Sequence, residues 1–185
     1  MSFRVALLYA SVGTGHKSAA LALEEWFHRE VPDSQVLCLD TLSFALPLVR
    51  GVYTRSYLEM VSHMPHLWGY FYETTDDPET RNGVIATLGE LTEKLNLLGL
   101  KKALSSFSPD AILFTHFFGA AAVADAFAPG VPVCYVNTDF LSHVFHRNPS
   151  FSAWFVSSDE TLQQYLADGL PPGKVFPTGI PVDPV

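Results

Sequence analysis

The sequence predicts an α/β domain built on a doubly wound parallel sheet. Short apolar runs, typical of strands buried on both faces, alternate along the chain with longer stretches of helical periodicity. Glycine, proline and serine separate these runs. The 185 residues suffice for one domain, and 48% hydrophobic against 16% charged residues provide enough apolar surface for a sizeable core.

The first half of the chain begins with a strand and a helix. Residues 3–10 form a near-continuous apolar run that Ser11 ends, as expected for a strand inside a parallel sheet. A helix is predicted over residues 17–29, where apolar residues recur at i, i+3 and i+7, and Pro32 stops it. This stripe consists of Ala20, Leu23 and Phe27. A second strand follows over residues 35–39.

The second half repeats the alternation with shorter elements. A long amphipathic stripe, made of Ile85, Leu88, Leu91, Leu95 and Leu98, precedes a strand over residues 111–115. The later predicted elements are an alanine-rich helix over 119–127, strands over 133–136 and 153–156, a helix over 160–166 and a last strand over 174–177. Strand, helix and strand repeated in this way predict a Rossmann-like sheet with right-handed crossovers.

Charge and cysteine usage exclude several classes of function. Eleven Lys and Arg against 19 Asp and Glu leave a formal net charge of -8, without a basic cluster, so no nucleic-acid partner is expected. Cys38 and Cys134 lie in apolar runs without CxxC spacing, which predicts two buried thiols in a reducing compartment. No apolar run matches a signal peptide or reaches the roughly 18 residues of a membrane span. We therefore expect a cytoplasmic location.

The loop after the first strand carries the strongest chemical signal. Gly13, Thr14 and Gly15 lie between a buried strand and a predicted helix N-terminus. Glycine lets the backbone approach a ligand closely, and the helix start supplies free N–H groups, so the loop is predicted to bind an anion or polar group. His16 follows at the mouth of the sheet. It either caps the helix or faces water, or it acts as a neutral general base; the neighbouring glycines favour the base.

Two familiar nucleotide motifs match this loop poorly. A Walker A loop needs a glycine immediately before its lysine, but His16 precedes Lys17. A dinucleotide fingerprint would begin at Gly13 and lose its third glycine at Ser18. Asp40 nevertheless ends the second strand where a ribose-binding acid would stand, so the dinucleotide interpretation remains an alternative.

A second group of polar residues follows the strand over 133–136. Asp139 can orient a histidine or accept a hydrogen bond from a sugar hydroxyl; the alternative is an aspartate that only caps a turn. His143 and His146 have a spacing that, with His116, suggests zinc. A zinc site needs further ligands in a defined geometry, so we expect ordinary polar loop histidines and no metal.

An aromatic excursion over residues 42–72 interrupts the regular alternation. Its weakly charged sequence indicates either core packing against neighbouring helices or a membrane-facing surface, because aromatic residues with a polar edge favour the membrane interface. The residues that would contact an acceptor or a membrane are Tyr53, Tyr57, Trp68, Tyr70 and Phe71.

Three motifs in this order resemble the N-terminal domain of monogalactosyldiacylglycerol synthases and the related processive diacylglycerol glucosyltransferases. The motifs are residues 11–20 (SVGTGHKSAA), Thr138-Asp139-Phe140 through His146, and residues 178–182 (TGIPV). The resemblance covers nearly the whole chain. It implies the N-terminal half of a GT-B fold, with an acceptor-side domain over residues 1–178 and residues 179–185 beginning a linker to a C-terminal donor domain.

The resemblance also implies a reaction and its partners. His16 corresponds to the family's candidate base, Gly13 and Gly15 face the donor phosphates, Asp139 matches the Thr-Asp motif, and residues 42–72 match the acceptor and membrane-docking region. The implied activity is inverting transfer of a hexose from a UDP-sugar, held mainly by the missing domain, to a lipid such as diacylglycerol at the inner face of the membrane. The implied chemistry needs no metal or cofactor, and the fragment alone is expected to be inactive. A non-catalytic lipid-binding module and a nucleotide-sugar epimerase-like enzyme remain the alternatives.

Overall fold

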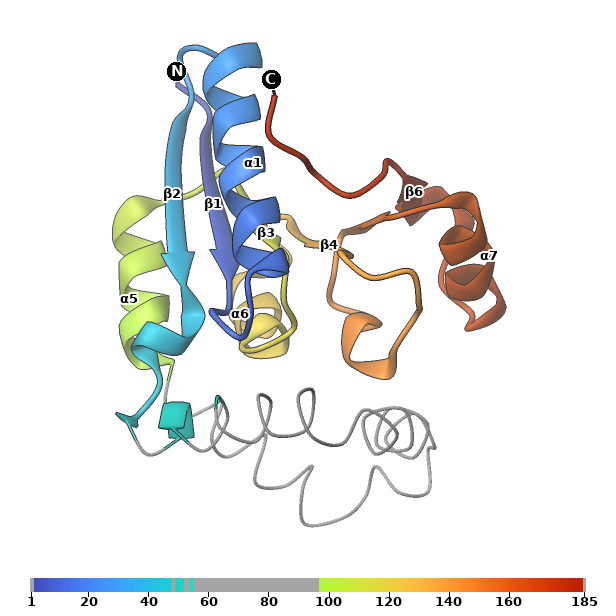
Figure 1. The fold of residues 1–185 in the computed structure, drawn as a ribbon. Helices are drawn as coiled ribbons and strands as arrows, with labels where there is room; N and C mark the ends of the chain where they lie inside the picture. The colour runs from blue at the N-terminus through green and yellow to red at the C-terminus, as the bar shows by residue number, and fades with distance from the viewer. Residues whose placement is uncertain (1, 48, 52–53, 55–96, 185) are drawn as a thin grey trace.

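A six-stranded parallel sheet with flanking helices accounts for residues 2–47, 49–51, 54 and 97–184, which are the residues that the computed structural model describes (Figure 1). The strand order is β2-β1-β3-β4-β5-β6, and every neighbouring pair is parallel. The strands are β1 (Arg4–Tyr9), β2 (Gln35–Asp40), β3 (Ala111–Phe114), β4 (Val133–Val136), β5 (Ala153–Val156) and β6 (Val175–Pro177). The helices are α1 (Gly15–Glu30), α5 (Leu98–Phe107), α6 (Ala120–Phe127) and α7 (Asp159–Ala167). The predicted doubly wound, Rossmann-like sheet is confirmed.

Strand β1 occupies the centre of the order and explains the apolar run at the N-terminus. It pairs with β2 on one side and with β3 on the other. Its four middle residues, Val5, Ala6, Leu7 and Leu8, have no exposed surface, because both faces of the strand are covered. The chain therefore leaves β1 toward β2 and later returns to its opposite side at β3. In open α/β sheets such a reversal creates a crevice at the carboxyl ends of the strands.

Helix α1 packs on the sheet through small side chains. It begins two residues earlier than predicted and contacts both β1 and β2. Its buried residues are Ala19, Ala20 and Ala22, whereas Leu23 and Phe27 of the predicted stripe are only partly buried. Three alanines on the inner face let the helix backbone lie close to the strands. The larger apolar residues therefore lie at the edge of the contact between helix and sheet.

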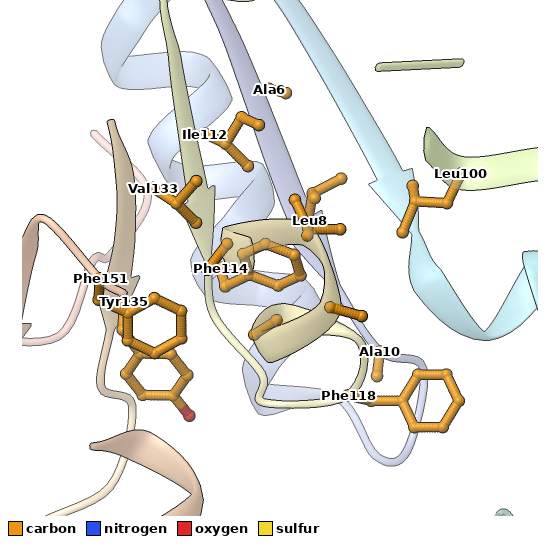
Figure 2. Close-up of a cluster of buried hydrophobic side chains, with 14 of the residues drawn as sticks. Ala6, Leu8, Ala10, Leu100, Ile112, Phe114, Phe118, Val133, Tyr135 and Phe151 are labelled. Atoms are coloured by element: carbon orange, nitrogen blue, oxygen red, sulfur yellow. The ribbon is translucent and has the colours of Figure 1, made fainter. Parts of the chain in front are cut away.

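Helix α5 begins at Leu98, the last residue of the predicted amphipathic stripe, and continues to Phe107. The other four residues of that stripe lie outside the described residues. The buried residues of α5, Leu100 and Leu104, continue the spacing from Leu97 at i+3 and i+7. These leucines join a core cluster in which side chains of β1, β3 and β4 meet (Figure 2). In the same view the rings of Tyr135 and Phe151 lie side by side, with centroids 5.8 Å apart.

Both cysteines are free and only partly buried, whereas the sequence predicted buried thiols. Each belongs to a strand, Cys38 to β2 at the sheet edge and Cys134 to β4. Partial burial nevertheless raises the pKa of the Cys38 thiol to about 12. Within the described residues no helix is both long and apolar enough to cross a membrane. The predicted acceptor or membrane residues Tyr53, Tyr57, Trp68, Tyr70 and Phe71 lie outside the described residues.

Candidate functional site

The candidate site lies at the carboxyl ends of β1, β3 and β4. Strands β1 and β2 point toward the lower part of Figure 1, and the loop after β1 turns back there into α1. The loop after β4 lies on the same side of the sheet and ends in the short 3-10 turn η3 (Val144–His146). Because all strands are parallel, their loops converge on this edge. The edge therefore gathers the polar residues that the sequence singled out.

The glycine loop combines a buried anchor with an exposed turn. Val12 is 1% exposed and belongs to the core, while Gly13, Thr14 and Gly15 are exposed. Gly13 has a φ of 98°, a left-handed conformation that side chains with a Cβ rarely adopt. A Cβ built on Gly15 meets no atom within 4 Å, so glycine there leaves open space above the helix start. Thr14 is the N-cap of α1, yet its side chain makes no capping hydrogen bond, so the hydroxyl does not occupy the N–H groups of the first turn.

Asp40 fastens this loop from the neighbouring strand. Its carboxylate accepts hydrogen bonds from the Ser11 hydroxyl at 2.6 Å and from the Ser11 backbone N–H at 3.2 Å. It also accepts from the Leu42 N–H at 3.0 Å, which caps the short turn η1 (Thr41–Phe44). A ribose-binding acid must turn its oxygens toward a ligand. Asp40 instead directs them to protein atoms, which weakens the dinucleotide alternative.

Replacing Asp40 with alanine should loosen the glycine loop and lower the free energy of unfolding by about 1–2 kcal/mol, because three hydrogen bonds lose a charged acceptor. Urea unfolding of the two proteins measures this difference. Asp33→Ala is the matched control, since Asp33 is exposed in the turn before β2, and its change should stay within about 0.5 kcal/mol. Equal losses in the two variants would contradict the anchoring role of Asp40.

His16 lies in the first turn of α1, where its ring contacts two threonines, one following β3 and one following β4. Its Nδ1 lies 2.7 Å from the backbone carbonyl oxygen of Thr115 and 2.9 Å from the Thr138 hydroxyl. The Thr115 hydroxyl in turn donates to the His16 carbonyl at 2.9 Å. A carbonyl oxygen only accepts, so Nδ1 must carry the proton. The other nitrogen, Nε2, is then the basic one, and within the described residues it has no hydrogen-bond partner.

The electrostatic surroundings keep His16 neutral. Its partial burial lowers the pKa below 6.5, while the negative charge of Asp139 and the Thr115 carbonyl oppose that shift. Asp139 is exposed, and its backbone N–H donates to Asn137. The structure thus brings the predicted pair His16 and Asp139 together, but the contact between them is through charge, and the ring is held by threonine oxygens.

Three further histidines, in the loops after β3 and β4, are buried. His116 meets the His16 ring edge-on at 4.6 Å, and its Nδ1 accepts from the Phe118 N–H. His146 stacks on Tyr135 at 4.8 Å and lies 5.8 Å from His143. Within the described residues no group of three or more His, Cys, Asp or Glu side chains is arranged to hold a metal ion. Burial lowers the pKa of His116 and of His146 well below 6.5, so both are neutral imidazoles in the folded chain.

These two buried imidazoles should make the fold less stable as the pH falls below 6.5. The unfolded chain binds protons on both histidines there and the folded chain does not, so stability decreases by up to about 1.4 kcal/mol per histidine for each pH unit. The prediction is checked by urea unfolding between pH 7.5 and about pH 5, above the range in which carboxylates titrate. His116→Asn can still accept from Phe118 and should remove one histidine's share of the slope; an unchanged slope would contradict a neutral, buried His116.

The loop after β4 is held against α7 by hydrogen bonds and one ion pair, in which Gln164 and Asp168 were not among the candidate residues. Asn137 is fully buried and donates to the Leu141 carbonyl and the Tyr165 hydroxyl. Gln164 accepts from the Ser142 N–H at 2.9 Å. Asp168 accepts from the Ser142 hydroxyl and pairs with Arg147 at 3.0 Å. These bonds fix the loop that carries Thr138 and Asp139 beside His16.

The sequence missed the parts of the site that depend on tertiary contacts. Thr138 appeared only as a member of a motif, and Thr115 only as the end of a strand. The same rule that drew attention to the loops after β1 and β4 applies to the end of β3, so Thr115 could have been found with it; His116 was considered only as a zinc ligand. No sequence signal marks a backbone carbonyl as the partner of a histidine.

Comparison with known proteins agrees with this architecture. In the solved structures, a protein described as a UDP-N-acetylglucosamine 2-epimerase from Listeria monocytogenes superposes with a TM-score of 0.53 at 15% identity, covering 97% of this chain and 45% of that one. The UDP-GlcNAc 2-epimerase of Neisseria meningitidis, solved with UDP-GlcNAc bound, gives 0.50 at 17% identity over 96% of this chain and 46% of its own. Identities this low show the fold alone. The fold is the Rossmann-like half of a GT-B-type architecture.

Sequence comparison identifies the family within that class. The family model of monogalactosyldiacylglycerol (MGDG) synthase matches residues 16–182, and the chain belongs to this family. Processive diacylglycerol beta-glucosyltransferases from Bacillus cytotoxicus and from Staphylococcus aureus strain MRSA252 are 25% and 24% identical over 182 residues. These alignments cover 97% of this chain but 45% and 44% of the relatives, so the chain spans less than half of their length.

Proposed function

We propose that this chain is the acceptor-side half of an inverting glycosyltransferase that moves a hexose from a UDP-sugar to a lipid acceptor such as diacylglycerol. The observation that carries the proposal is His16. Its Nδ1 is bound to the Thr115 carbonyl, which leaves Nε2 as a base at the crevice of the sheet. Membership of the MGDG synthase family and the relatives named as diacylglycerol glucosyltransferases support the substrate class.

In the proposed reaction the acceptor hydroxyl gives its proton to Nε2 of His16 and its oxygen attacks the anomeric carbon. The bond from that carbon to the UDP oxygen breaks, and UDP departs with the electron pair, so the configuration inverts. Asp139 stabilises the imidazolium through its charge. The exposed turn over residues 13–15 and the uncapped N–H groups of α1 suit an anion such as the donor diphosphate.

Exposed apolar side chains on the loop after β4 are consistent with a lipid acceptor. Phe140 and Leu141 follow Asp139 directly and are 66% and 58% exposed, and Phe145 of the same loop is 41% exposed. Exposed apolar side chains on the loop that carries Asp139 are compatible with contact to a lipid. The predicted peripheral location at the cytoplasmic face of the membrane is part of the same proposal.

The test is transfer of radiolabelled hexose from a panel of UDP-sugars to diacylglycerol in phosphatidylglycerol liposomes, using the full-length polypeptide that contains this chain. We expect a glycosyl-diacylglycerol whose anomeric configuration is opposite to that of the donor. Retention of configuration would refute the single displacement. A folded protein that transfers to no lipid but modifies the free UDP-sugar would instead favour the epimerase-like alternative.

A further inference from the structure

We propose that Thr138 is a positioning residue for His16: its hydroxyl oxygen, together with the Thr115 carbonyl, forms a two-oxygen clamp on Nδ1 that orients the ring and supports its imidazolium form. This inference deepens the proposed function and rests on it for the role of His16. The observation behind it is that Nδ1 lies within hydrogen-bond distance of both oxygens, at 2.9 Å from the Thr138 hydroxyl and 2.7 Å from the Thr115 carbonyl.

The protonation of the ring decides what Thr138 can do. Since the Thr115 carbonyl cannot donate, the proton on Nδ1 is shared between two acceptors, and the Thr138 hydroxyl presents a lone pair to it. When Nε2 takes the acceptor's proton, the positive charge spreads to Nδ1–H. Both bonds then become charge-assisted and strengthen. The clamp therefore favours the protonated ring more than the neutral ring.

The backbone on both sides of Thr138 is fixed, so its hydroxyl does not need to be ordered during the reaction. Ahead of it, the Asn137 N–H donates to the Phe155 carbonyl at 2.8 Å. Behind it, the Asp139 N–H donates to the Asn137 side chain at 2.7 Å, and the Asp139 carbonyl accepts from Ser157 at 2.6 Å. The second residue of the clamp is fixed too, since the Thr115 N–H donates to the Leu8 carbonyl of β1 at 2.9 Å. Each oxygen of the clamp is thus attached to the sheet.

Other charged or titratable groups also face the His16 ring. Among the described residues these are Asp139 from the loop after β4, His116 from the end of β3 and His146 from η3. Asp139 raises the pKa of His16, and the two buried histidines are neutral. None of these groups supplies an oxygen to Nδ1. The effect of a substitution at Thr138 on the His16 pKa can therefore be distinguished from the effects of these groups.

The experiment compares Thr138→Val with the wild-type chain by long-range proton–nitrogen NMR of 15N-labelled histidine, with the His16 signals assigned by loss in His16→Ala. We expect the Nδ1–H tautomer in wild type. Valine has nearly the shape of threonine but no acceptor, so it should lower the pKa of His16 further, by about half a unit or more. Thr138→Ser should restore the wild-type value.

Thr41→Val is the matched control, because this buried hydroxyl donates to the Tyr9 carbonyl at 3.0 Å and does not touch His16. It should lower stability without moving the His16 signals. If the wild-type spectrum shows the proton of the neutral His16 ring on Nε2, the clamp is overturned whatever the variants do. An unchanged pKa in Thr138→Val, with Thr138→Ser the same, would overturn the role of Thr138.

Transfer assays on the full-length polypeptide separate this inference from the proposed function. Thr138→Val should reduce kcat about tenfold and move the acidic limb of the kcat profile to lower pH, with KM for the lipid unchanged. Serine should recover most of the rate. Normal transfer by Thr138→Val would reject the positioning role and leave the transferase intact. Absence of transfer by wild type, with the NMR response intact, would reject only the proposed reaction.

Discussion

Replacing His16 with alanine in the full-length polypeptide should lower kcat for hexose transfer by about a hundredfold or more, the usual contribution of a general base. The acceptor hydroxyl would then have to lose its proton to water, because within the described residues no other group occupies the position of Nε2. The KM for the lipid should change little, since the imidazole acts mainly in the transition state.

The pH dependence gives the same prediction a second readout. Below its pKa the ring is already protonated at Nε2 and cannot accept a proton, so wild-type kcat should fall on the acidic side. Because partial burial lowers the pKa of His16 below 6.5, this limb should lie below pH 6.5. The limb should be absent from the residual activity of His16→Ala.

His28→Ala is the control for this experiment. His28 lies on the same helix, in its last turn, and is exposed far from the site. Its removal should leave kcat within about twofold of wild type, as expected for a surface substitution. Near-normal transfer by His16→Ala, in a protein with unchanged unfolding behaviour, would show that His16 is not the base.

Replacing Trp154 with alanine should reduce the free energy of unfolding by about 3–5 kcal/mol. Trp154 is only 2% exposed, lies in β5 between Tyr135 and Val175, and packs edge-on against Phe151. Its indole N–H also donates a buried hydrogen bond to the His146 carbonyl at 2.6 Å. The substitution therefore removes a large apolar side chain and leaves a buried carbonyl without its donor.

Urea unfolding checks this prediction, and Trp26→Ala provides the comparison. Trp26 also donates its indole N–H to a backbone carbonyl, that of Val182 at 2.8 Å, but its side chain is 37% exposed. Its removal should cost about 1 kcal/mol, because a partly solvated site loses less apolar burial. Equal losses for the two tryptophans would mean that the hydrogen bond, and not burial, dominates at Trp154.

The fold could be predicted because its determinants are local. The apolar run of β1 and the turn signal at Ser11 suffice to predict a central strand and a following loop. The helix boundaries were less accurate: α1 begins at Gly15, and α5 continues to Phe107, beyond Leu98 where the predicted stripe ended, although Leu100 and Leu104 continue a helical spacing. The inner face of α1 was also misjudged, since alanines rather than larger residues let a helix approach a sheet most closely.

The candidate site was predictable only in outline. Because parallel strands end at one edge of the sheet, the sequence could predict that His16 and Asp139 lie near each other. The ring, however, is held by Thr138, 122 positions away, and by a carbonyl 99 positions away. Such partners depend on the register between β1, β3 and β4, which no pattern within one strand encodes. For the same reason Asp40, a candidate ribose ligand by position, is in fact bound to Ser11.

The two anchors of the glycine loop bear on how tightly a ligand can be held. Ser11 is fastened to Asp40 and His16 to Thr115, while Val12 is buried, so only residues 13–15 are left to become ordered around a ligand. Fixing three backbone residues costs at most about 3–6 kcal/mol of conformational entropy at 25 °C. Half of the turn is thus already fixed when the protein folds, so a diphosphate would lose less of its interaction energy to ordering the chain than it would on a wholly mobile loop.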